Sequence, residues 1–171
     1  MNNNWLSIDP SKAGTGVAVW EGRELQHSFV IKPRGTKGKY YFDGFILDSR
    51  HEVFGRLPAL ASTKLDCYIE KGMGRHSNAI RAQGWMCGYI DSKFEAAGRK
   101  SPIEVVVSEW RRVIKEDQGI SWPAKRVRKK ALAIDLVKEL YNLDVCDDEA
   151  DAILLGRACI RMFNIKDKRD V

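Results

Sequence analysis

The chain has 171 residues, enough for a domain that buries about 70% of its unfolded surface, so a core needs no covalent or metal support. Its 29 Lys and Arg against 23 Asp and Glu give a net charge of +6, and no apolar run approaches the ~20 residues that span a bilayer. Cys67, Cys87, Cys146 and Cys159 are widely spaced, which predicts buried reduced thiols and argues against a disulfide framework or a zinc site. We therefore expect one soluble cytoplasmic domain over residues 1–171, with a frayed tail at 164–171.

Three strands are predicted in the first 33 residues. Two alternating apolar runs between Trp5 and Gly22 flank a turn rich in Asp, Pro, Ser and Gly, which is typical of a hairpin. Asp9 closes the first run, and its alternative role is to cap its own turn. A third strand is predicted from Arg23 to Pro33, and a helix follows from Tyr40 to about Ala61.

The middle of the chain predicts a strand, a helix and another strand. The strand Lys64 to Glu70 again ends in an acid, and a helix is expected from Ser77 to Gly98. The VVV run in Ser101 to Ser108 predicts a fifth strand that is buried on both faces, as a parallel neighbour would be. This order of elements indicates an α/β layer with a mixed sheet.

The last third predicts a loop and two helices. We expect a polar loop from Glu109 to Gly119 and a helix from about Ser121 to Tyr141 with strongly basic first turns. The last helix, from Asp147 to about Phe163, opens with acids, as helix N-termini often do.

Two acids of this last helix deserve a functional interpretation. Asp148 and Asp151 are three residues apart and share one helix face. A dipole or capping role is sufficient for Asp148 but accounts poorly for Asp151, which lies in an apolar turn. If both meet Asp9 and Glu70, four carboxylates would repel one another unless a cation lay between them. Oxygen ligands of this kind select Mg²⁺ or Mn²⁺, and two such ions ~4 Å apart suit phosphoryl transfer.

These segments resemble the RuvC family of Holliday junction resolvases. The resemblance is carried by the IDP strand with its Gly-containing turn, by YIE at the end of the fourth strand and by DDEADA at the start of the last helix. It extends from Trp5 to about Ile160 and fits a phage or other viral version as well as a bacterial one. It implies a ribonuclease H-like fold, with a five-stranded mixed sheet and helices on both faces. It also implies a Mg²⁺-dependent endonuclease, with two ions per site and Mn²⁺ as a substitute, that cuts four-way DNA junctions symmetrically in recombination and repair.

The resemblance also implies roles for individual residues. The metal-binding catalytic acids would be Asp9, Glu70, Asp148 and Asp151, with Asp147 as the alternative to Asp148. Where the family carries an aromatic wedge after the Glu, this chain has Met73, followed by Arg75 as a candidate phosphate contact. Lys130 aligns with a family residue near the scissile phosphate and is a further catalytic candidate.

A concentrated basic segment lies between residues 111 and 130. Such a run is as often a solvated face, but beside a phosphate-handling site it favours contact with a DNA backbone. The candidate DNA-binding residues of this segment are Arg111, Arg112, Lys115, Lys125, Arg126, Arg128, Lys129 and Lys130.

Two symmetric cuts require two sites, so we expect a homodimer, formed through the helix Ser77 to Gly98 with Trp85, Met86 and Tyr89 at the interface. Three alternatives remain open at this stage. One is another ribonuclease H-like nuclease that acts on RNA–DNA hybrids or on forked or flapped DNA. The second is a sugar-kinase or actin-like ATPase, although those proteins need two such domains. The third is a non-catalytic junction-binding module.

Overall fold

The computed structural model describes residues 4–11, 14–32, 66–71, 77–96 and 98–166, and within 77–96 it describes only part of the side chains. Five strands form one sheet in the order β3-β2-β1-β4-β5. Their bounds are β1 Asn4–Asp9, β2 Thr15–Glu21, β3 Glu24–Ile31, β4 Asp66–Lys71 and β5 Ile103–Val106. The first three strands are antiparallel, whereas β1 and β4, and β4 and β5, run parallel. The predicted mixed five-stranded sheet is therefore confirmed.

The register of β1 against β4 determines the relative positions of Asp9 and Glu70. Ile8 lies beside Ile69 in this parallel pair, so the residues that follow them, Asp9 and Glu70, lie at the same level of the sheet. On the other side of β1, Asp9 is the register partner of Gly16 in β2. Asp9 is the last residue of β1 and Glu70 the last but one of β4, so the two acids are neighbours at one edge of the sheet.

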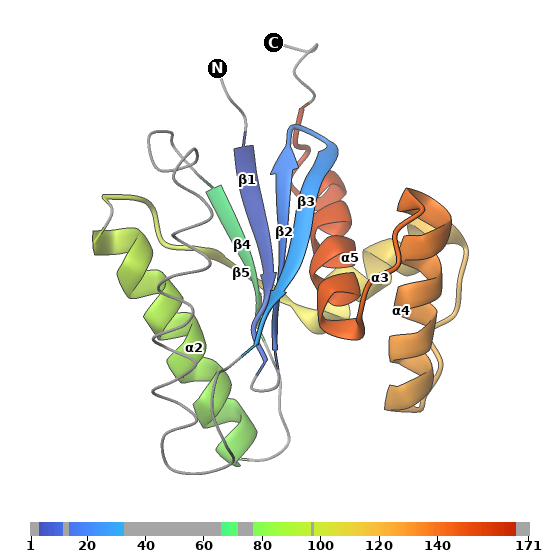
Figure 1. Cartoon of the computed structure of the whole chain (residues 1–171), viewed down its shortest axis with the longest axis horizontal. Helices are drawn as coiled ribbons and strands as arrows, with labels where there is room; N and C mark the ends of the chain where they lie inside the picture. Colours follow the sequence, from blue (N-terminus) through green and yellow to red (C-terminus); the bar gives the residue numbers. More distant parts are fainter. Residues whose placement is uncertain (1–3, 12–13, 33–65, 72–76, 97, 167–171) are drawn as a thin grey trace.

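Helices cover both faces of the sheet, as expected (Figure 1). The helix α2, Ser77–Ala96, packs through Phe94 on a core that contains Leu6, Ile8 and Ile69. The opposite face carries the larger core, which includes Trp20 and Leu155. The helices of that side are α3 Val107–Gln118, α4 Arg126–Tyr141 and α5 Asp147–Met162. Of these, α5 lies directly on the sheet and α4 lies outermost.

The prediction of a loop at 109–119 was wrong, because residues 109–118 lie within helix α3 and Gly119 is its C-cap. Trp110 and Ile114 are one turn apart and fully buried, and the partly buried Val113 packs against the same core. The helix ends at Gly119, which adopts the left-handed conformation (φ 62°) that glycine tolerates best. The apolar residues of this segment recur at helical spacing, and the charged residues between them led to its prediction as a polar loop.

The fifth strand is shorter and more exposed than predicted. It comprises only Ile103–Val106 at the edge of the described sheet, where Val105 is buried but Ile103 is 43% exposed. Val107 already begins α3, so the VVV run is divided between two elements. Its expected burial on both faces is therefore wrong.

Some of the other sequence predictions are confirmed and others are wrong. Helix α4 begins at Arg126, a few residues later than expected, whereas the last helix has the predicted start. All four cysteines are free, and two of them, Cys67 and Cys159, are buried, but Cys146 is exposed. The helix predicted at 40–61 lies outside the described residues. None of the described helices has the length and apolarity that a bilayer-spanning helix requires.

Candidate active site

Helix α5 is fixed on the sheet by a buried chain of hydrogen bonds. The Ser7 hydroxyl of β1 donates to the carbonyl of Ala152 in α5 at 2.8 Å, and the Trp20 indole of β2 donates to the same hydroxyl at 2.9 Å. Gly156 makes this approach possible, because a Cβ atom there would lie 2.3 Å from the indole nitrogen of Trp20. The helix therefore has one close-packed position on β1 and β2.

The hairpin glycines bring the first turn of α5 next to Asp9. A Cβ on Gly16, the register partner of Asp9, would lie 1.9 Å from the carbonyl oxygen of Asp148. A Cβ on Gly14 would lie 2.9 Å from the Asp148 carboxylate. Any side chain at Gly16 would thus push the start of α5 away from the strand ends.

Four carboxylates from three elements converge there. Asp9 and Glu70 are only 8% and 9% exposed, and the Asp151 side chain is 14% exposed. Burial raises the pKa of Asp9 well above its usual value, and the charges of Glu70, Asp151 and Asp148 raise it further. Burial and the Asp151 charge raise the pKa of Glu70 to about 7. The structure thus brings together the four acids that the sequence singled out.

Asp148, and not Asp147, faces this carboxylate cluster. Asp147 forms an ion pair with Lys130 of α4, whereas the Asp148 charge acts on both Asp9 and Asp151. Lys130 lies at the rim of the cluster, where it counteracts the rise that burial causes in the pKa of Asp151. The alternative of Asp147 as a cluster member is therefore not favoured by the structure.

Two further groups that contact the cluster come from helix α3. The sequence analysis missed this contribution because it predicted the segment as a loop. The fully buried Trp110 donates its indole N–H to Glu70 Oε2 at 2.8 Å. The Arg111 guanidinium pairs with Asp151 Oδ2 at 3.4 Å. It also lies over the Trp110 ring at 4.9 Å and over the Trp122 ring at 5.4 Å. Arg111 was predicted to bind DNA, but in the structure it contacts a cluster acid.

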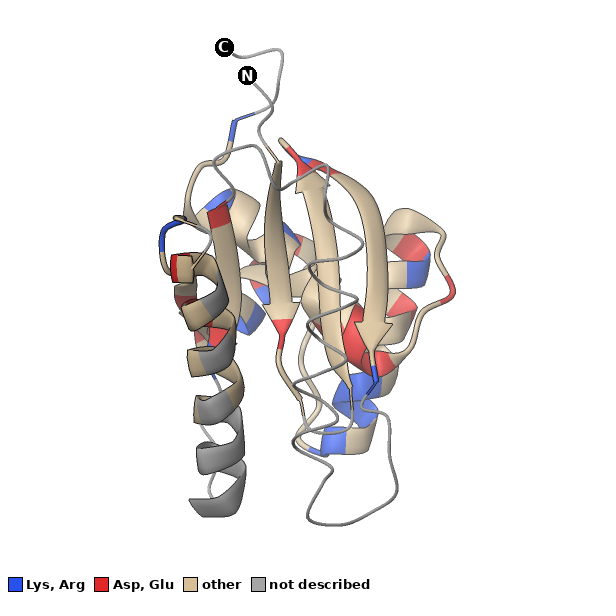
Figure 2. Ribbon diagram, turned by 60° about the vertical axis from the view of Figure 1, so that its left-hand side comes forward, with Lys and Arg blue, Asp and Glu red and all other residues tan. Residues whose placement is uncertain are grey.

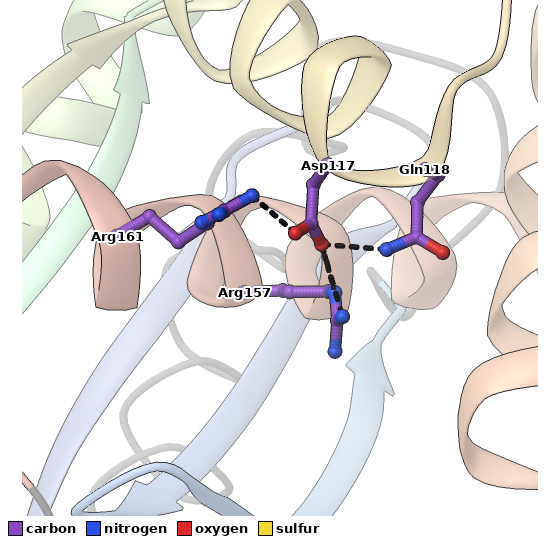
Figure 3. A network of polar contacts seen from close by, with 4 residues as sticks. All are labelled: Asp117, Gln118, Arg157 and Arg161. Atoms are coloured by element: carbon purple, nitrogen blue, oxygen red, sulfur yellow. Dashed lines mark hydrogen bonds and ion pairs between the residues drawn. The ribbon is translucent and has the colours of Figure 1, made fainter.

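The far end of α3 is pinned to α5 by Asp117 (Figure 3). Asp117 accepts hydrogen bonds from Arg157 at 3.0 Å and from Gln118 at 2.5 Å, and it also pairs with Arg161. Arg157 and Arg161 are one turn apart on α5, so a single carboxylate clamps two of its turns. This contact holds the α3 residues Trp110 and Arg111 in register with the acids of α5.

The other predicted DNA-binding residues are distributed over two helices. Arg112 and Lys115 of α3 are exposed, and Arg112 pairs with Glu116 at 2.9 Å. The start of α4 gathers basic residues at the end of the molecule where the acids of α5 lie (Figure 2). In this group Lys125, Arg126 and Arg128 are exposed, and Lys129 and Lys130 are half-buried. Met73 and Arg75 lie outside the described residues.

The donor set fits a hard divalent cation, because all four converging side chains are carboxylates whose charges repel. Within the described residues, however, no three carboxylate, imidazole or thiol groups are arranged to hold an ion together. Glu70 and Asp151 instead face Trp110 and Arg111. Asp9, Glu70, Asp148 and Asp151 remain the residues that could supply ligands after side-chain rotation.

Comparison with known proteins identifies the fold. No protein-family sequence model matches the chain, and no curated protein matches it. Its structure is similar to Thermus thermophilus RuvC in complex with a Holliday junction substrate, with a TM-score of 0.65 at 16% identity over 95% of this chain and 98% of that one. A second Thermus thermophilus RuvC structure gives a TM-score of 0.63 at 16% identity, over 96% and 98% of the two chains. The chain therefore has the ribonuclease H-like fold of the RuvC Holliday junction resolvase structures.

Proposed function

We propose that this chain is a divalent-metal-dependent endonuclease that resolves four-way DNA junctions. The observation that carries the proposal is the convergence of four carboxylates from β1, β4 and α5 beside a basic surface. One solved structure with the same fold is a RuvC complex with a Holliday junction substrate, which supports branched DNA as the substrate class.

The carboxylate cluster would carry the chemistry. Asp9, Glu70, Asp148 and Asp151 would hold two Mg²⁺ ions, or Mn²⁺ in their place. When bound, such ions activate a water molecule and stabilise the leaving oxygen of the phosphodiester. Lys130 lies at the rim of the cluster, where its ammonium would meet a backbone phosphate at the point of cleavage.

The start of α4 would grip the DNA backbone. Its first turn contains no acid, although acids are favoured at a helix N-terminus and cations are not. Lys125, Arg126 and Arg128 are exposed there, so their charges are available to phosphates. Arg112 and Lys115 of α3 are also exposed and would supply further phosphate contacts. Binding of this kind weakens steeply as the salt concentration rises.

Paired cuts would require a homodimer, for which we propose α2 as the interface. Met86 does not belong to it, because this side chain is 3% exposed in the single chain and packs inward. The side chains of Trp85 and Tyr89 lie outside the described residues. Gly84 and Gly88 are exposed one turn apart, with open space around both, so the helices of two copies could approach closely along this line.

Cleavage of matched substrates tests the proposal. A four-way junction, a Y-fork, a linear duplex and an RNA–DNA hybrid are incubated with the protein and Mg²⁺, and Asp9→Asn serves as the blank. We expect paired symmetric nicks in the junction alone, with 5′-phosphate ends, and no cleavage in the blank. Preferential cutting of the fork or the hybrid would assign the site to another ribonuclease H-like nuclease. Junction binding without cleavage in Mg²⁺ or Mn²⁺ would indicate a non-catalytic binding module.

A further inference from the structure

We infer that Arg111 is an internal counter-cation of the carboxylate cluster, which orients Asp151 in the metal-free protein and weakens the binding of divalent ions there. Arg111 acts through Asp151 and is therefore a positioning residue. The inference rests on the proposed metal site, and it assigns to Arg111 a role other than contact with DNA.

The first argument is how firmly Arg111 is held. Its guanidinium lies over the rings of Trp110 and Trp122, which meet edge to face at 5.9 Å. The Trp122 indole donates a hydrogen bond to the Arg111 carbonyl at 2.8 Å, so the second ring is tied to the backbone that carries the arginine. Two aromatic faces attract a cation and restrict where it can move. The positive charge is thus kept beside the cluster.

The second argument is the placement of the charge. The Arg111 side chain is 23% exposed, and among the described residues it forms an ion pair with Asp151, at 3.4 Å. Asp151 is one of the four carboxylates that converge there, so a cation held beside it reduces their mutual repulsion in the absence of metal.

The third argument is that hydrogen bonding alone does not explain this placement. The Nε–H of Arg111 is buried and has no acceptor among the described residues, which is an unfavourable position for a donor. The neighbouring Arg112 shows the ordinary alternative, because it is exposed and pairs with Glu116 one turn away. Arg111 therefore keeps its Nε–H buried beside the acids at some cost, and the compensation is electrostatic.

A divalent ion that binds the cluster must displace the Arg111 guanidinium from the Asp151 carboxylate. It is then repelled by the positive charge of Arg111 nearby. Both effects oppose metal binding, since like charges a few ångströms apart repel strongly in a partly buried site. Removal of the arginine charge should have two opposite effects. The metal-free protein becomes less stable, whereas its affinity for the ion increases.

Arg111→Met tests this inference, because a long unbranched side chain can still fill the space between the two indoles without a charge. Arg112→Met is the matched control on the same helix, and Arg111→Lys retains the charge. Mn²⁺ binding is measured by electron paramagnetic resonance without DNA, and Tm is measured in EDTA and in Mg²⁺. We expect the Mn²⁺ midpoint of Arg111→Met to fall at least about fivefold, with no such fall in Arg112→Met or Arg111→Lys. We also expect a lower Tm than that of the unchanged protein in EDTA and a larger rise on addition of Mg²⁺.

The outcomes distinguish the counter-cation role of Arg111 from the proposed metal site. Equal Mn²⁺ midpoints in Arg111→Met and Arg112→Met would overturn the counter-cation role and leave the metal site intact. Absence of Mn²⁺ binding in the unchanged protein would overturn the metal site itself, and the role of Arg111 with it. If Arg111→Met does not fold, Arg111→Gln is the second variant. Refolding of either variant on addition of Mn²⁺ supports the inference, and failure of both to refold assigns Arg111 to packing.

Discussion

Asp9 and Glu70 lie side by side near the ends of the adjacent parallel strands β1 and β4, and each carboxyl group changes the pKa of the other. The Glu70 charge raises the pKa of Asp9, and a hydrogen bond from Asp9 lowers that of Glu70 against the stronger effect of burial. Two buried acids side by side are unfavourable for a metal-free protein at neutral pH. The arrangement becomes favourable when a cation joins them, which links the stability of the chain to its proposed chemistry.

The stability of the metal-free protein should therefore fall as the pH rises. The pKa of Glu70 is about 7 in the folded chain and near 4.5 in the unfolded one, so the folded state binds more protons between these values. The free energy of unfolding should decrease by up to about 3 kcal/mol as the pH rises through this window. Above the folded-state pKa, Glu70 should cause no further decrease. Asp9 shifts in the same direction and adds to the fall. Urea unfolding in EDTA from pH 5 to pH 8 measures the effect, and a rise in stability over this range would contradict it.

Glu70→Gln should flatten this pH dependence and stabilise the metal-free protein near pH 8, because the amide cannot ionise. The same variant should lose cleavage, as should Asp9→Asn, with kcat reduced by at least about 10³-fold. Junction binding should persist or tighten, since a negative charge near the phosphate is removed. Glu149→Gln is the matched control, because Glu149 lies in the first turn of α5 but bonds to Ser28 of β3. If Glu70→Gln unfolds instead, its carboxylate is structural.

Gly16→Ala should displace α5 and weaken the site. The added Cβ would lie 1.9 Å from a backbone oxygen of Asp148, where the helix cannot yield without breaking the contact of Ser7 with Ala152. We expect a loss of about 1–3 kcal/mol in the free energy of unfolding, together with reduced metal binding. Urea unfolding measures the loss, and a Gly16→Ala protein as stable as the unchanged chain would disprove the close approach.

Arg126→Gln combined with Arg128→Gln should weaken junction binding and reduce its salt dependence. Both residues are exposed at the start of α4, so each would release about one counterion when it contacts a phosphate. The slope of log K against log salt should become less steep by about 2. Lys138→Gln removes a charge near the other end of the same helix, where Lys138 pairs with Asp144, and should leave the slope unchanged. Fluorescence anisotropy with an uncleavable junction gives both slopes.

The sequence was informative where a single element determined the position of a residue. Asp9 and Glu70 close alternating apolar runs, and strand periodicity alone places them at strand ends. The choice between Asp147 and Asp148 was not accessible in this way. Both occupy the first turn of α5, and only the contact of that turn with Gly14 and Gly16 shows which one faces the cluster.

Helix α3 escaped prediction for a related reason. Its apolar residues, Val107, Trp110, Val113 and Ile114, recur at helical spacing, but the high content of charged residues between them led to its prediction as a polar loop. The contacts of Trp110 with Glu70 and of Arg111 with Asp151 arise between residues 40 positions apart. Such pairs follow from the packing of helices on the sheet, which local patterns do not encode.

Gly88→Arg should prevent the proposed dimer without unfolding the chain. Gly88 is exposed on α2 with open space around it, so a single chain accommodates a long side chain there and gains helix propensity. In a dimer that packs two copies of α2 together, the same side chains would place two positive charges in one interface. We expect monomers by sedimentation, an unchanged or higher Tm for the monomer, and single nicks in place of paired cuts. Glu95→Arg is a control for added charge near the end of the same helix. A Gly88→Arg protein that remains dimeric would show that the dimer forms through another surface.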